Sequence, residues 1–142
     1  MEFGFAFAAE SAQPIPDGRF SVLGGGLDGY IAPSLPIIAR SLALIVELRF
    51  KHDECGRKHS LKMQVMGPGG NKVQELDNIA LAPEPDPHFP EHPMNLHVVI
   101  NLINLVFDST GFYKFVFISS DKTIGVMEFG IALAEPKADP GA

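Results

Sequence analysis

The chain has 142 residues, the length of one domain, and can bury a hydrophobic core without disulfides or a structural metal. Its formal net charge is −6 and its Lys and Arg residues are scattered. Nucleic acid is therefore not expected as a partner, because phosphate binding needs clustered basic side chains. The single cysteine, Cys55, excludes an internal disulfide and fits a reducing compartment.

The N-terminal residues favour a cytoplasmic location. Residues 1–13 read MEFGFAFAAESAQ, with Glu2 where a signal peptide carries basic residues, and Gly4 breaks a short apolar run. No stretch approaches the roughly eighteen apolar residues that a membrane span needs. We therefore expect a cytoplasmic protein with no membrane partner.

The first third of the chain predicts short strands separated by turns. Aromatic residues at positions 3, 5 and 7 alternate with small ones, which is typical of a strand. Two prolines and an Asp-Gly pair in residues 13–18 then predict a turn. A second strand, 19–23, runs into three glycines at 24–26, which indicate a bulge or bend.

The segment Ile37–Phe50 is open to two interpretations. Arg40 and Glu47 could lie on the polar side of a helix, but five apolar residues follow a strict period of two: Leu42, Leu44, Val46, Leu48 and Phe50. We therefore predict a long strand over 41–51. Alternation predicts two further strands, 58–66 and 73–81.

The centre of the prediction is a pair of apolar runs in 95–119. The first run is apolar on both alternating faces, which indicates a strand covered on two sides. The second run carries three aromatic residues on one face: Tyr113, Phe115 and Phe117. A proline-rich loop, 82–93, precedes the pair, and a strand over 123–134 follows it.

These segments predict an all-β protein of seven to nine strands. Because the connections are too short for crossover helices, the sheets should be mostly antiparallel. A strand buried on both faces requires two layers, so we expect a Greek-key or jelly-roll-like sandwich over 1–134. The sequence of Val106–Tyr113 is typical of a tyrosine corner. The tail, 135–142, has nothing to bury and should be loose.

Three motifs carry a resemblance to a known family. They are AESAQPIPDGRFSVLGGG (9–26), GRKHSLKMQVMGPGG (56–70) and STGFYKFVF (109–117). Together they are similar to a family of small bacterial proteins of unknown function. The chain departs from that family at Leu27, where a tryptophan commonly follows the triple glycine. The resemblance implies the sandwich fold and implies no activity.

Metal binding is the first chemical hypothesis. His52, Cys55 and His59 form an H-x2-C-x3-H pattern, and His88 and His92 lie in the proline-rich loop. A structural zinc needs four ligands, so the two groups would have to meet in space. The simpler interpretation is a hairpin turn that histidines flank by chance, with loop histidines in solvent. We therefore assign no metal ligand.

Catalysis and cofactor binding have less support. Cys55 lies beside Glu54, and a neighbouring carboxylate raises the pKa of a thiol rather than lowering it. No serine lies in a Gly-x-Ser-x-Gly elbow. The glycines at 24–26 lack the following lysine and helix of a phosphate-binding loop. The leading expectation is therefore a protein with no catalytic residue, no cofactor and no enzymatic activity.

The sequence has more apolar residues near its middle than one sandwich core can cover. If 98–107 and 112–118 form a hairpin, Leu105 faces Lys114 and one apolar face is left over. If the connection crosses between the sheets, 98–107 still has two apolar faces. The candidate interface residues are Ile103, Leu105, Phe107, Phe112, Val116 and Ile118. The proline-rich loop, a homo-oligomer or another protein would cover them.

Two functions remain open from the sequence. The leading hypothesis is a non-catalytic binding or assembly module whose partner is itself, most simply as a dimer, or another protein. The alternative is a metal-binding protein or metal-dependent enzyme that uses His52, His59, His88 and His92.

Overall fold

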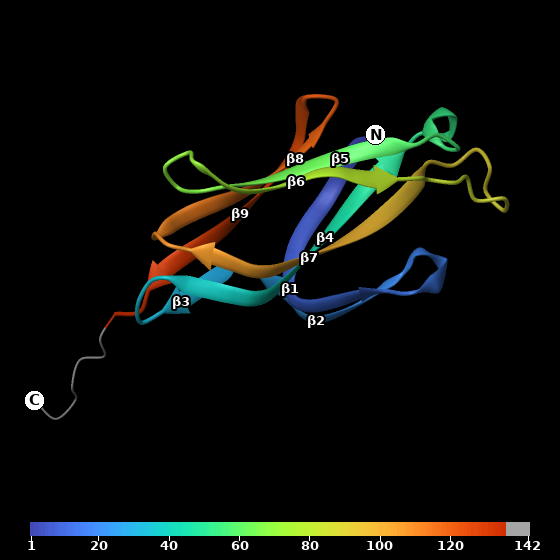
Figure 1. Cartoon of the computed structure of the whole chain (residues 1–142). Helices are drawn as coiled ribbons and strands as arrows, with labels where there is room; N and C mark the ends of the chain where they lie inside the picture. Colours follow the sequence, from blue (N-terminus) through green and yellow to red (C-terminus); the bar gives the residue numbers. More distant parts are fainter. Residues whose placement is uncertain (136–142) are drawn as a thin grey trace, which may run out of the picture.

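Two β-sheets packed face to face make up the protein (Figure 1). The computed structural model describes residues 1–135, of which 68% are in strands, and this confirms the all-β prediction. Besides the strands, the described part has two three-residue 3₁₀ turns, Pro16–Gly18 and His52–Glu54. Its strands are β1 (Glu2–Pro14), β2 (Phe20–Leu27), β3 (Gly29–Ala32), β4 (Ile37–Phe50), β5 (His59–Met66), β6 (Lys72–Leu81), β7 (Met94–Phe107), β8 (Gly111–Ser119) and β9 (Lys122–Leu133).

The sheets have four and five strands. The four-stranded sheet has the order β2-β1-β4-β7, and the five-stranded sheet has the order β3-β9-β8-β5-β6. Strand pairs within them are antiparallel, as predicted, except that the short β3 runs parallel to β9. This topology leaves β2, β7, β3 and β6 as the four edge strands of the described chain.

The segment with two interpretations, Ile37–Phe50, is the strand β4. It lies between β1 and β7 in the middle of the four-stranded sheet. Its period-two residues from Leu42 to Phe50 are fully buried in the core between the sheets. The alternation thus determines the structure, because every second residue of a strand points to the same face.

A second apolar cluster lies on the other face of the four-stranded sheet. Ala9, Ala43 and Ile45 are 0% exposed there. Ala43 and Ile45 alternate along β4 with core residues, so they point away from the sandwich interior. The neighbours that pack against this cluster come from β1, β2 and β7: Phe7, Phe20, Val22 and Val99. The three alanines of the cluster, Ala9, Ala12 and Ala43, are small enough for these larger side chains to cover it.

The hairpin interpretation of 98–118 is wrong, because β7 and β8 belong to different sheets. Strand β7 pairs with β4, and β8 pairs with β5 and β9. Lys114 lies opposite Met66 and Glu128 instead of Leu105. The chain therefore crosses from one layer to the other between Phe107 and Gly111.

The tyrosine corner predicted at this crossing is present. The Tyr113 side chain is fully buried, and its ring packs edge-on against Phe107 with centroids 4.8 Å apart. Its hydroxyl accepts hydrogen bonds from the backbone N–H groups of Asp108 and Ser109, each at 3.2 Å, and donates to Asp108 Oδ1 at 3.2 Å. The buried hydroxyl thus fixes the loop that carries the chain between the layers.

The alternation of inward-facing and outward-facing residues along β7 shifts by one position at Asn104. Leu102 and Leu105 are both buried, whereas Ile103 is 70% exposed. A regular strand would place Leu105 on the same face as Ile103. Asn104 has φ of 54°, in the left-handed region that asparagine tolerates better than most residues. The irregularity turns both Leu105 and Phe107 into the core.

The expected loose tail, 135–142, lies outside the described residues except for Glu135. Within residues 1–135, no helix has the length and apolar character needed to cross a membrane.

Replacing Tyr113 with Phe tests the crossover. Tyr113→Phe leaves the Asp108 and Ser109 amides without their acceptor, so the free energy of unfolding should fall by about 1–3 kcal/mol. The matched control is Tyr30→Phe: Tyr30 also packs edge-on against Phe107, but its hydroxyl has no hydrogen-bond partner within residues 1–135. The control should change stability by less than about 0.5 kcal/mol in urea unfolding. Equal effects of the two substitutions would contradict the assignment.

Candidate functional site

The histidines of the metal hypothesis make separate local contacts. His59 Nε2 lies 2.7 Å from the Glu54 carbonyl oxygen, and its ring packs against Phe50 with centroids 4.9 Å apart. His92 packs edge-on against Phe89 in the proline-rich loop. Within the described residues, no group of three or more His, Cys, Asp or Glu side chains is placed to hold a metal ion.

The other two members of the metal hypothesis and Cys55 are equally local. His52 is exposed in the turn after β4, and His88 is exposed in the loop, where its backbone N–H bonds to Asp86 Oδ1 at 2.8 Å. The Cys55 thiol donates to the Lys51 carbonyl oxygen at 3.5 Å. The thiol therefore caps its own turn.

The six predicted interface residues do not form one surface. Leu105 and Phe107 are 2% and 0% exposed within the chain's own core, so their assignment to an interface is wrong. The shift at Asn104, which the sequence alternation does not show, is the reason. Ile103 is exposed on the four-stranded sheet. The remaining three lie on β8 in the five-stranded sheet: Phe112 is 64% exposed, and Val116 and Ile118 are half-buried.

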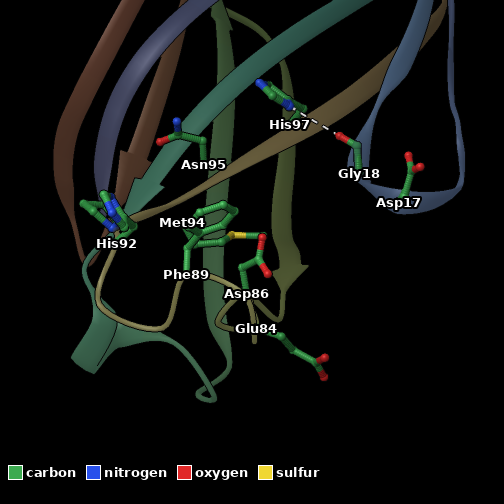
Figure 2. A pocket seen from close by; sticks show the side chains of 10 residues that line it. Asp17, Gly18, Glu84, Asp86, Phe89, His92, Met94, Asn95 and His97 are labelled. Carbon is green, nitrogen blue, oxygen red and sulfur yellow. Dashed lines mark hydrogen bonds between the residues drawn. The ribbon is translucent and has the colours of Figure 1, made fainter.

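A cavity of about 610 Å³ opens between the turn of the β1–β2 hairpin, the proline-rich loop and the start of β7 (Figure 2). Asp86, Phe89 and Met94 line this cavity together, and the Glu84 side chain points away from them in Figure 2. Three carboxylates line the cavity, those of Asp17, Glu84 and Asp86, and no Lys or Arg does. The resulting negative potential disfavours anionic ligands.

His97, which also lines this cavity, connects three elements. Its Nδ1 lies 3.4 Å from the Gly18 carbonyl oxygen in the hairpin turn (Figure 2). Its Nε2 lies 3.7 Å from Oε1 of Glu47 on β4. The ring packs against Phe20 and Phe5, with centroids 5.1 and 6.2 Å apart. His97 therefore fixes the hairpin turn against β7.

Glu47 is the one charged residue buried within the described chain, at 7% exposed. Its Oε2 lies 3.5 Å from Nη2 of Arg49, and the register aligns it with Phe5 on β1 and His97 on β7. Gly4 makes room for the carboxylate, since a Cβ there would lie 2.5 Å from Oε2. The cluster of Gly4, Glu47, Arg49 and His97 was missed from the sequence, because only the pairing of β1, β4 and β7 brings these residues together.

A double-mutant cycle tests this arrangement. Gly4→Ala should lower the free energy of unfolding by about 1–3 kcal/mol, because the new methyl group overlaps the Glu47 carboxylate. In a Glu47→Ala background the same change should cost at least about 1 kcal/mol less. Gly69→Ala is the control, since its Cβ would meet nothing closer than 3.8 Å. Additive effects in urea unfolding would contradict the contact.

Three of the four edge strands carry features that hinder pairing with another chain. Strand β3 has only four residues. Strand β2 contains three glycines, of which Gly24 and Gly26 have positive φ. Strand β6 carries three charged residues, Lys72, Glu75 and Asp77. Short length, bulges and charges all reduce edge-to-edge association.

The charge on β6 is held in place by cross-strand contacts. Gln64 Nε2 donates to Glu75 Oε1 at 2.8 Å, and this hydrogen bond, with that from Lys72, lowers the pKa of the Glu75 carboxyl below its ordinary value. Strand β6 therefore carries a carboxylate that Gln64 holds in place against β5.

The fourth edge strand, β7, has few such features. It is fourteen residues long and contains no Asp, Glu, Lys, Arg, Pro or Gly. Its one interruption is the left-handed Asn104. Ile103 and Val106 on β7 and Ile38 on β4 are 70%, 41% and 56% exposed, and Ile38 lies directly opposite Val106. We call these three residues the β4–β7 margin. A long, uncharged edge with exposed aliphatic side chains favours pairing with another strand.

Comparison with known proteins gives a family and no activity. No curated protein matches the chain. Residues 4–132 match a family described as a family of unknown function (DUF6941), and this match runs from within β1 to within β9. The chain therefore belongs to that family of unknown function.

Proposed function

We propose that the protein is a non-catalytic assembly module that associates through the β4–β7 margin. The observation that carries this proposal is the contrast among the edge strands. Three of them are short, kinked or charged, and β7 is long and uncharged. A protein that is to remain monomeric normally protects such an edge.

The energetics of the margin support association. Full burial of a Val or Ile side chain contributes about 1.5–3 kcal/mol. Ile38, Ile103 and Val106 are 56%, 70% and 41% exposed. Covering Ile103 alone would contribute roughly 1–2 kcal/mol, and covering all three roughly 2.5–5 kcal/mol. Backbone hydrogen bonds along the free edge of β7 would add to this.

Within residues 1–135, no specific contact favours the alternative, a metal protein using His52, His59, His88 and His92. His59 and His92 pack on aromatic rings, and the other two are exposed in turns. The setting we propose for the assembly is the bacterial cytoplasm. The resemblance of the sequence motifs and the single thiol of Cys55 support that setting.

Light scattering coupled to size exclusion tests the proposal. The wild type should have at least twice the chain mass of 15.4 kDa at micromolar concentration. Ile103→Asp should give a folded monomer, because it places a charge beside the pairing edge. Leu23→Asp is the control: Leu23 is 71% exposed on the opposite edge strand of the same sheet, and this variant should assemble like the wild type.

Two results would contradict the proposal. One is a wild-type mass of 15.4 kDa at every concentration tested. The other is one zinc or iron ion per chain in the purified protein, lost in His52→Ala or His59→Ala, which would favour the metal alternative.

A further inference from the structure

We infer that the partner of β7 is the β7 strand of a second copy of this chain. The two strands would run antiparallel about a two-fold axis at Asn101 and join the two four-stranded sheets into one of eight strands. This inference rests on the proposed assembly function and specifies its partner and its register.

The charge distribution favours a second copy along this edge. Each chain has a formal net charge of −6, so two copies repel each other over most of their surfaces. Strand β7 has no ionised Asp, Glu, Lys or Arg, so two β7 edges can approach without like-charge contacts. Most closed homo-oligomers use such a self-complementary patch about a two-fold axis.

The position of Asn104 limits the register. Its left-handed φ of 54° interrupts the regular strand, so an intermolecular ladder should end before it in both copies. A two-fold axis normal to the sheet keeps the outer faces of both copies on one side. Each residue of one copy then lies opposite a residue of the second copy whose number differs from its own by an even number. An axis at Asn101 places the regular segment 99–103 opposite itself and leaves both Asn104 residues outside.

This register gives Ile103 an apolar partner. With the axis at Asn101, Ile103 lies opposite Val99 of the second copy, and the exposed Asn101 lies opposite its own equivalent. Val99 pairs with Ile45 on β4, at the second apolar cluster. The apolar row Ile45–Val99 therefore continues into Ile103 of the second copy. Moving the axis by one residue toward the N-terminus would place Ile103 opposite His97.

Charge substitutions at Asn101 test the axis directly. Asn101 is exposed on the outer face, so the variants should fold. Asn101→Lys alone and Asn101→Asp alone should each raise the dimer dissociation constant about tenfold or more, because like charges then face each other across the axis. An equimolar mixture of the two should restore wild-type association as a heterodimer, seen in native mass spectrometry. Asn101 variants that dimerise as the wild type does, or a mixture that stays monomeric, would overturn the inference.

Cysteine cross-linking tests the register independently, in a Cys55→Ser background. Asn101→Cys should oxidise to a disulfide-linked dimer. Val99→Cys and Ile103→Cys should cross-link with each other when mixed and neither with itself. Leu23→Cys, on the opposite edge, should stay monomeric in denaturing electrophoresis.

The outcomes separate the two proposals. A wild type that is monomeric rejects the assembly function and this pairing together. A wild type that assembles, but cross-links at Leu23 as readily as at Asn101 or fails to cross-link at Asn101, rejects the β7 pairing and leaves the assembly function standing.

Discussion

Hydrogen bonds of the Tyr113 hydroxyl to Asp108 and Ser109 hold together the point where the chain changes layers. They join the first two residues after β7, Asp108 and Ser109, to a side chain on β8 at the point where consecutive strands enter different sheets. If the two strands had formed a hairpin, β8 would pair with the edge of β7 that is now free. Because the chain crosses instead, β7 becomes an edge strand with a free row of backbone groups.

Much of the fold follows from local patterns. The period-two residues of β4 and the Val106–Tyr113 segment predict a buried strand and a tyrosine corner, and both are present. Each of these depends on side chains a few residues apart, whose relation the sequence shows directly. The family match of residues 4–132 agrees with the resemblance of the sequence motifs in naming no activity.

The parts that the sequence does not predict depend on pairing between distant strands. In a regular β7 strand, Leu105 and Phe107 would both lie on the outer face of the sheet. The left-handed Asn104 turns both residues into the core instead. The burial of Glu47 requires Gly4 on β1 and His97 on β7 at the same level of the sheet. A contact between residues 4 and 47 leaves no periodic trace in either segment.

Amide hydrogen exchange on β7 tests most directly whether its edge is paired in solution. The measurement compares the amides of 99–103 that do not bond to β4 with those of the other edge of the same sheet, β2. Pairing predicts that these β7 amides exchange slowly at high protein concentration and faster on dilution, because the paired edge reopens as the dimer dissociates. The amides of β2 that do not bond to β1 should exchange rapidly at both concentrations. Rapid exchange of the same β7 amides at every concentration would contradict the account.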